Sequence, residues 1–200
     1  MKILALSDLH SDIPKDLRNG FDFSEIDLIC IAGDLTNFGL KEDYIYIFKW
    51  FDKLNIPTVI VLGNHDHPLF FYEINREKYK NLIFLNNEIK EVNGLKIYGS
   101  PYTKYCGWFN HYLTLDECRE LTLPKEKVDL IVSHEPPDTE MLAKVNDRLI
   151  VGNNELLKYL HEYSNITAIF GHIHQRGGKE EIINGNKCYN VARTYKIIEV

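Results

Sequence analysis

The sequence contains no long hydrophobic run. The apolar stretch that opens it, MKILALSDLH, breaks at Ser7 and Asp8, so it is too short for a membrane span or for the core of a signal peptide. The cysteines lie far apart and form no CxxC pair, and we interpret them as reduced, small buried hydrophobic residues. We therefore expect a cytoplasmic protein that contacts no membrane. The cysteines are Cys30, Cys106, Cys118 and Cys188.

The chain also lacks an excess of positive charge. Its 23 Lys and Arg residues are outnumbered by 29 Asp and Glu residues, which gives a formal net charge of −6. Since phosphate backbones attract surfaces rich in Lys and Arg, we expect no long nucleic acid as a partner. A small anionic substrate remains compatible with this charge if the site itself supplies positive charge.

No repeat, low-complexity tract or linker divides the sequence. With 44% hydrophobic and 26% charged residues, the composition is that of a folded globular protein and excludes a disordered chain. A length of 200 residues fits one domain. We therefore expect a single domain over residues 1–200.

Short apolar runs rich in β-branched residues alternate with helical patterns. Continuous hydrophobicity predicts strands that are covered on both faces. Apolar spacing predicts helices over Glu42–Leu54 and Asn153–Tyr163, with a weaker helix over about Leu69–Tyr79. Asn93-Gly94 predicts a hairpin within Glu88–Gly99, and a similar pattern recurs near the C-terminal end. The chain is thus expected to form an α/β domain with two sheets. The predicted strands are Ile3–Leu6, Leu28–Ala32, Thr58–Leu62, Leu130–Val132 and Ile166–Phe170.

Polar motifs follow all of these runs. In a mainly parallel sheet the strand ends would meet along one edge, where open α/β sheets bind their ligands. The i, i+2 spacing of Asp8 with His10, and of His172 with His174, would direct both side chains to one side of an extended strand end. Each motif alone is more often a turn, a helix cap or a buried histidine, but together they indicate a site. The motifs are Ser7-Asp8-Leu9-His10, Gly33-Asp34, Gly63-Asn64-His65-Asp66, Ser133-His134-Glu135 and Gly171-His172-Ile173-His174.

The motifs bring together carboxylate, amide and imidazole groups without a thiolate. Such ligands favour Mn, Fe, Zn or Ni over a metal that selects sulfur. Their number exceeds what one ion needs and suits two ions that share a carboxylate, for which Asp34 is the natural bridge if Asp8 is a terminal ligand. His67, His111 and His161 lack this placement, and we interpret them as structural or solvated.

Taken in order, the motifs DxH, GD, GNHD, SH and GHxH resemble those of the calcineurin-like metallophosphoesterase family. The resemblance extends from Asp8 to His174. It implies a four-layer α-β-β-α sandwich of two mixed β-sheets flanked by helices, with a centre of two divalent ions, for which we expect Mn, with Fe, Zn or Ni as alternatives. It also implies that His65 is unliganded and lies near the phosphate. The implied ligands are Asp8, His10 and His174 for the first ion, and Asn64, His134 and His172 for the second, with Asp34 between them.

Three further segments are similar to the small metallophosphoesterases related to the brain "239" proteins, a subgroup that includes phosphodiesterases. They are Ile97–Thr103, Gly107–Asn110 and Ser133–Pro137. Glu135 departs from this subgroup, since a Thr often stands there in its members. The larger Ser/Thr protein phosphatases match poorly, because Asp34 is followed by Leu-Thr-Asn-Phe-Gly and the GDxVDRG signature is absent.

The expected reaction is hydrolysis of phosphodiester bonds in small or nucleotide-like substrates. Two divalent ions, two Asp residues and a metal-bridging hydroxide would leave the site at about +1, which attracts phosphate. The hydroxide would attack phosphorus in line, and His65, held by Asp66 or another carboxylate, would stabilise or protonate the leaving oxygen. A phosphomonoesterase remains an alternative. A non-catalytic scaffold is less favoured, because Asn64, His65 and His134 are all present.

The segment from Tyr102 to Tyr112 is rich in aromatic residues. We interpret it as a small satellite core, while stacking on a substrate base remains an alternative. Lys104 and Arg176 could meet phosphate oxygens, but a solvated position is the simpler interpretation. The cluster consists of Tyr102, Tyr105, Trp108, Phe109 and Tyr112.

Overall fold

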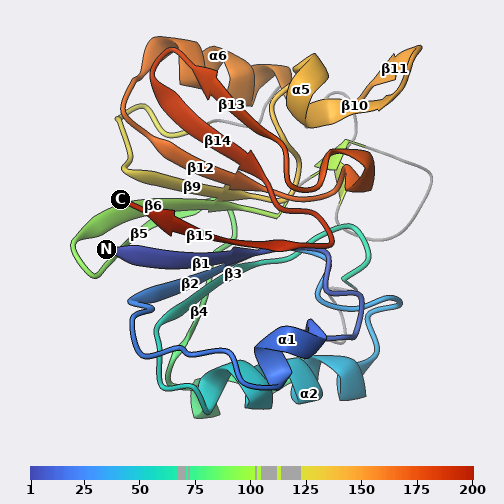
Figure 1. The fold of residues 1–200 in the computed structure, drawn as a ribbon, viewed down its shortest axis with the longest axis vertical. Helices are drawn as coiled ribbons and strands as arrows, with labels where there is room; N and C mark the ends of the chain where they lie inside the picture. The colour runs from blue at the N-terminus through green and yellow to red at the C-terminus, as the bar shows by residue number, and fades with distance from the viewer. Residues whose placement is uncertain (67–70, 72, 102, 105–111, 114–122) are drawn as a thin grey trace.

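The computed structural model describes residues 1–66, 71, 73–101, 103, 104, 112, 113 and 123–200. Their helices and strands form four layers (Figure 1). Helices α1 (Lys15–Arg18) and α2 (Lys41–Asp52) cover one sheet, whereas α5 (Glu140–Ala143) and α6 (Asn154–Glu162) cover the other. The expected α-β-β-α sandwich is confirmed.

The first sheet has the strand order β15-β1-β2-β3-β4. Strands β1 to β4 run parallel to one another, and β15 pairs with β1 in the antiparallel direction. The bounds are β1 (Lys2–Leu6), β2 (Leu28–Ala32), β3 (Thr58–Val61), β4 (Leu82–Phe84) and β15 (Tyr195–Glu199).

The second sheet has the order β13-β14-β12-β9-β6-β5, with antiparallel pairs at its two edges and parallel pairs between them. Short pairs form outside both sheets, β7 with β8 and β10 with β11. The described residues also contain the 3₁₀ helices η1 and η2. The bounds in the sheet are β5 (Glu88–Val92), β6 (Leu95–Ser100), β9 (Leu130–Ser133), β12 (Thr167–Phe170), β13 (Glu180–Ile183) and β14 (Asn186–Asn190). Those outside it are β7 (Thr103–Lys104), β8 (Tyr112–Leu113), β10 (Lys144–Asn146), β11 (Leu149–Ile150), η1 (Arg76–Lys78) and η2 (His174–Arg176).

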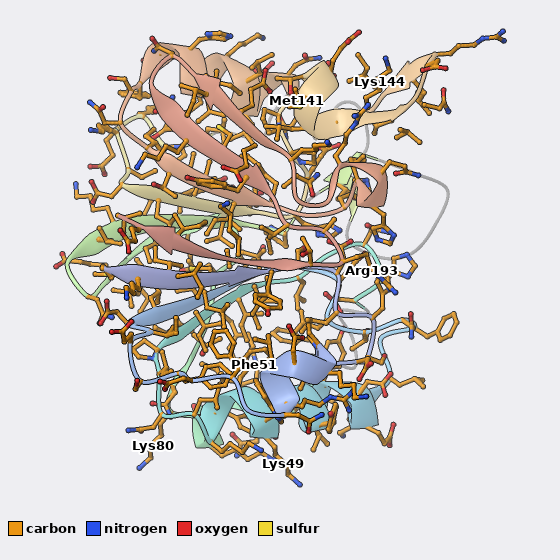
Figure 2. The ribbon with its side chains drawn as sticks, in the orientation of Figure 1. Lys49, Phe51, Lys80, Met141, Lys144 and Arg193 are labelled. Carbon is orange, nitrogen blue, oxygen red and sulfur yellow. The ribbon has the colours of Figure 1, made fainter. Side chains whose placement is uncertain are left out.

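Three clusters of buried apolar side chains fill the spaces between the layers. In β1, Leu4 belongs to the same cluster as Phe51 of α2, whereas the neighbouring Ile3 belongs to the cluster between the two sheets. Figure 2 shows Phe51 between α2 and the first sheet. Leu160 of α6 belongs to the third cluster, on the outer face of the second sheet. Because successive strand residues point to opposite faces and both faces are covered, the strands are continuously apolar.

All of the predicted strands are strands in the structure, but they do not share one sheet. The first three runs form β1, β2 and β3 of the first sheet, and the last two form β9 and β12 of the second. The expectation of a single sheet edge is therefore wrong, because pairing between distant segments decides which strands join. The parallel strands of both sheets nevertheless run in the same direction, so their carboxyl ends lie on the same side of the molecule (Figure 1).

The predicted hairpin and helices are also present. β5 and β6 are joined through Asn93 (φ 51°) and Gly94 (φ 81°), the left-handed pair that a tight hairpin favours. α6 begins after Asn153, whose side chain accepts a hydrogen bond from the Leu156 N–H at 3.0 Å. Part of the weaker predicted helix lies outside the described residues, and residues 73–79 contain only the 3₁₀ helix η1. No pattern in the sequence predicted β4.

Cys30 and Cys188 are buried and carry free thiols, as expected of small buried residues. Burial, followed by the charge of Glu181, raises the pKa of Cys188 to about 12. Cys106 and Cys118 lie outside the described residues. Among the helices of the described residues, none has the length and apolar character needed to cross a membrane.

Candidate metal centre

The candidate ligands lie in turns that follow the strands. The backbone is left-handed at Asp8 (φ 54°), His10 (φ 47°), Asp34 (φ 50°) and His172 (φ 67°). The sequence analysis assumed that residues spaced i, i+2 lie in an extended strand end. That assumption is wrong here, because the backbone at Asp8, His10 and His172 is left-handed. Left-handed backbone is costly for residues that carry a side chain, and its accumulation at one place is typical of a functional site.

One group of donors gathers around Asp8 and His174. His174 Nε2 lies 2.8 Å from Asp8 Oδ1 and 3.2 Å from His10 Nε2. His10 Nε2 lies 3.8 Å from Asp34 Oδ2. One ligand atom from each of these four residues lies within 4.8 Å of the others.

A second group of donors adjoins the first through Asp34. His134 Nε2 lies 3.3 Å from Asp34 Oδ1 and 3.0 Å from Asn64 Oδ1. His134 Nδ1 donates a hydrogen bond to the Ala32 carbonyl at 2.7 Å, so Nε2 is the nitrogen that faces the group. The His172 ring lies 5.1 Å from the His134 ring, centroid to centroid.

Three glycines allow these side chains to approach the backbone. A Cβ added at Gly63 would lie 2.2 Å from Asp34 Oδ1, and one at Gly33 would lie 2.4 Å from His134 Nδ1. A Cβ at Gly171 would lie 2.4 Å from Asp8 Oδ2. The glycines of three motifs are thus required by the packing of carboxylates and imidazoles, and not only by turns.

Burial and charge determine the protonation of the cluster. Burial opposes charge at both Asp34 and His134, but their mutual attraction outweighs it, so the pKa of Asp34 is lowered and that of His134 is raised to about 10. Burial, and then the charge of His134, lowers the pKa of His172 to about 4. Burial also lowers the pKa of His10. His10 and His172 therefore favour the neutral imidazole, the form that binds metals.

The arrangement of these side chains suits a bound metal ion better than a network of hydrogen bonds among them. The Nε2 atoms of His10 and His174 face each other, and neutral rings can share only one proton between them, whereas a cation accepts both lone pairs. The complete donor set contains two carboxylates, one amide and four imidazoles, which suits divalent transition metals. The members are Asp8, His10, Asp34, Asn64, His134, His172 and His174.

His65 and Asp66 lie beside this donor set but face different partners. The His65 N–H donates a hydrogen bond to Asp34 Oδ1 at 2.8 Å, and its Nδ1 donates to the Asn37 carbonyl at 2.9 Å. The Asp66 carboxylate accepts instead from the N–H groups of Leu35, at 3.1 Å, Thr36, at 3.0 Å, and Gly63, at 2.8 Å. The group at His65 Nδ1 is thus a backbone carbonyl, where the sequence suggested Asp66 or another carboxylate.

Asn37 is a site residue that the sequence reasoning missed. Its side-chain amide donates to the His10 carbonyl at 2.8 Å, and its N–H donates to Ser11 Oγ at 3.0 Å. Asn37 therefore fixes the loop after β2 against the loop after β1. The polar residues that follow Gly33-Asp34 were the available signal.

The remaining candidates play smaller parts or lie outside the described residues. His161 is exposed on α6. Arg176 Nε donates to the Lys144 carbonyl at 2.9 Å, and Glu135 is buried. Nothing is described of the side chains of Lys104 and Tyr112. The structure does not describe His67, His111 and the other members of the aromatic cluster, Tyr102, Tyr105, Trp108 and Phe109.

The fold and this donor set define a class of protein. The calcineurin-like phosphoesterase family matches residues 1–176, so the chain belongs to that family. Members of the family are hydrolases that use divalent metal ions, and the cluster around Asp8 is a place where such an ion could be held.

Individual relatives differ in length and name. The chain is 29% identical, over 99% of its length, to 19% of the probable rhamnogalacturonate lyase C of Emericella nidulans. It is 26% identical, over 76% of its length, to 57% of a 3′,5′-cyclic-nucleotide phosphodiesterase of Nostoc sp.. The chain thus spans about a fifth and somewhat over half of these relatives. One solved structure superimposes with a TM-score of 0.73 over 99% of this chain and 98% of its own, at 15% identity, which shows a shared fold.

Proposed function

We propose that this chain hydrolyses phosphodiester bonds in small or nucleotide-like substrates. The observation that supports this most strongly is the convergence of two carboxylates, an amide and four imidazoles where the strands of both sheets end. The similarity to a cyclic-nucleotide phosphodiesterase of Nostoc sp. supports diesters in particular.

We propose that the donor set holds two divalent ions, with manganese as the metal, because oxygen and imidazole ligands suit it. Bound ions would attract the phosphate by their charge and would lower the pKa of water, which makes hydroxide available at neutral pH. Asp34 contributes one oxygen to each donor group. The remaining ligands would be Asp8, His10 and His174 for one ion, and Asn64, His134 and His172 for the other.

His65 is proposed to act on the leaving group. Its Nδ1–H is engaged by the Asn37 carbonyl, so Nε2 is the atom that would transfer a proton to the leaving oxygen when the ring is protonated at both nitrogens. The His65 ring lies 4.8 Å from the His10 ring, beside the donor set. Asp66 would support this arrangement indirectly, since it fastens the backbone of Leu35 and Thr36 to the loop that carries His65.

A comparison of two aryl esters tests the proposal. The protein is stripped with a chelator, reloaded with Mn, Ni, Zn or Mg, and assayed with bis(4-nitrophenyl) phosphate and with 4-nitrophenyl phosphate. We expect metal-dependent hydrolysis with the diester cleaved faster. His161→Ala, at an exposed position of α6, serves as the matched control and should retain full activity.

The other outcomes are equally informative. Faster cleavage of the monoester would replace the proposal with a phosphomonoesterase on the same site. Cleavage of neither ester with any of the metals would favour a non-catalytic scaffold.

A further inference from the structure

Arg193 lies in the turn between β14 and β15, beside the candidate metal centre. Its N–H donates a hydrogen bond to the Ser7 carbonyl at 3.3 Å, and the preceding residue, Ala192, forms an isolated bridge with Ser7. Ser7 directly precedes Asp8. Figure 2 shows Arg193 at the end of the sandwich where the strands of both sheets finish.

Arg193 lines an open hollow of about 190 Å³. Asp8, a member of the donor set, contributes to the wall of the same hollow. Pockets that hold a whole small ligand measure about 300–1,000 Å³, so this hollow suits a single group of a ligand. The other lining residues are Ser7, Leu9, Asp12, Pro14 and Thr194.

The acidic residues of this hollow are already engaged by other partners. Asp12 Oδ1 pairs with Arg18 Nη2 at 3.2 Å. Asp8 Oδ1 faces His174 Nε2 at 2.8 Å, and Asp8 Oδ2 accepts from the His172 N–H at 3.0 Å. Within the described part of the chain, the exposed guanidinium of Arg193 makes no ion pair or hydrogen bond. Arg193 thus offers unused donors and a positive charge next to the metal centre.

The backbone of Arg193 is unusual as well, with φ at 58°. Among the described residues other than glycine, five more left-handed positions are asparagines, which tolerate this conformation. All the remaining ones gather around the candidate centre. They are Asp8, His10, Ser11, Asp34, His172 and Arg193. Arg193 therefore shares with the donor set a strained backbone of the kind that accompanies function.

We propose that Arg193 determines substrate specificity by binding an anionic group, a carboxylate or a second phosphate, that the substrate carries beyond the phosphoester to be cleaved. The proposal rests on the proposed function, which places that phosphoester at the metal centre. Guanidinium donors match the oxygens of carboxylate and phosphate in pairs, so either anion satisfies the same site.

Binding of two matched phosphonates tests the proposal without turnover, because their C–P bond is not hydrolysed. 3-Phosphonopropionate carries a carboxylate at the position where propylphosphonate has a methyl group, and 1,3-propanediphosphonate carries a second phosphonate. Calorimetry on the metal-loaded protein should give about fivefold tighter binding for the two doubly anionic probes. Arg193→Gln should remove this preference and leave the affinity for propylphosphonate unchanged.

Three further variants separate charge from backbone effects. Arg193→Lys should restore part of the preference, since it keeps the charge and loses the planar fork. Arg193→Gly relieves the left-handed strain but lacks the side chain, and it should behave like Arg193→Gln. Arg148→Gln removes another exposed arginine side chain, in the turn between β10 and β11, and should behave like the wild type.

The possible results distinguish a failure of the proposed role of Arg193 from a failure of the proposed phosphoester site. If the wild type binds all three probes equally, or if Arg193→Gln keeps the preference, the role of Arg193 is overturned while the phosphoester site stands. If the wild type binds none of the probes, the phosphoester site itself is overturned, and the role of Arg193 with it.

Discussion

The carboxylate of Asp34 touches both halves of the candidate centre. Oδ2 lies 3.8 Å from His10 Nε2, and Oδ1 lies 3.3 Å from His134 Nε2. Oδ1 also accepts the N–H of His65, so the histidine outside the donor set is positioned by the same side chain. A single residue thus links the proposed metal ligands to the proposed acid, and substitutions can test these two roles separately.

Replacement of His65 should separate catalysis from metal binding. We expect His65→Ala to retain both ions and the fold but to lose about 10²–10⁴-fold in turnover, the usual contribution of a proton donor. The measurement is diester hydrolysis alongside metal content by elemental analysis. Full activity, or loss of an ion, would contradict the assigned role of His65.

Replacement of His134 should reduce metal binding, which replacement of His65 should leave intact. His134→Ala removes a buried side chain whose Nε2 faces Asn64 and Asp34, so we expect one of the two ions to be lost together with activity. Metal content per protein is the deciding measurement, with His161→Ala as the control. Retention of two ions by His134→Ala would exclude it as a ligand.

At the scale of elements, the site depends on loops that are fastened to one another. The Asp8 N–H donates to the Gly33 carbonyl at 3.0 Å, which joins the turn after β1 to the turn after β2. Asp66 joins the turn after β2 to the turn after β3 through Leu35, Thr36 and Gly63. These hydrogen bonds hold the turns together beyond the strand ends, where the hydrogen bonds of the sheet have stopped.

Asp66→Asn should therefore destabilise the fold around the site. The amide keeps the size of the carboxylate but turns one acceptor into a donor that faces buried N–H groups, which costs about 1–3 kcal/mol. Chemical denaturation measures the loss in the free energy of unfolding. Asp147→Asn, at a fully exposed position, is the control and should change it by less than about 0.5 kcal/mol. Equal effects of both substitutions would mean that the Asp66 network contributes no stability.

The predictable parts of the fold were those that depend on nearby residues. The apolar runs and the Asn93-Gly94 turn are local signals, and the structure contains both. The division of the strands between two sheets was not predicted, since it depends on pairing between distant segments. For the same reason the sequence did not reveal that the Asn37 carbonyl would meet His65.

For the whole molecule, the donor set lies across the junction of the two sheets. Asp8, Asp34 and Asn64 follow strands of the first sheet, whereas His134 and His172 follow strands of the second. Ions held by both groups would therefore cross-link the halves of the sandwich. Because the unfolded chain scatters these ligands, bound ions would stabilise the folded state in proportion to their occupancy.

Metal removal should accordingly lower the melting temperature by a predictable amount. At free ion concentrations about 100 times the dissociation constant, each site adds about 2.7 kcal/mol to the free energy of unfolding. In a chain of 200 residues, 1 kcal/mol shifts the melting temperature by about 2–4 °C, so two sites should shift it by about 10–20 °C. Calorimetry of the chelated and the Mn-loaded protein measures this shift. Asp34→Asn, which weakens both donor groups, should lose most of it. A melting temperature that is independent of metal in the wild type would contradict a centre that joins the two sheets.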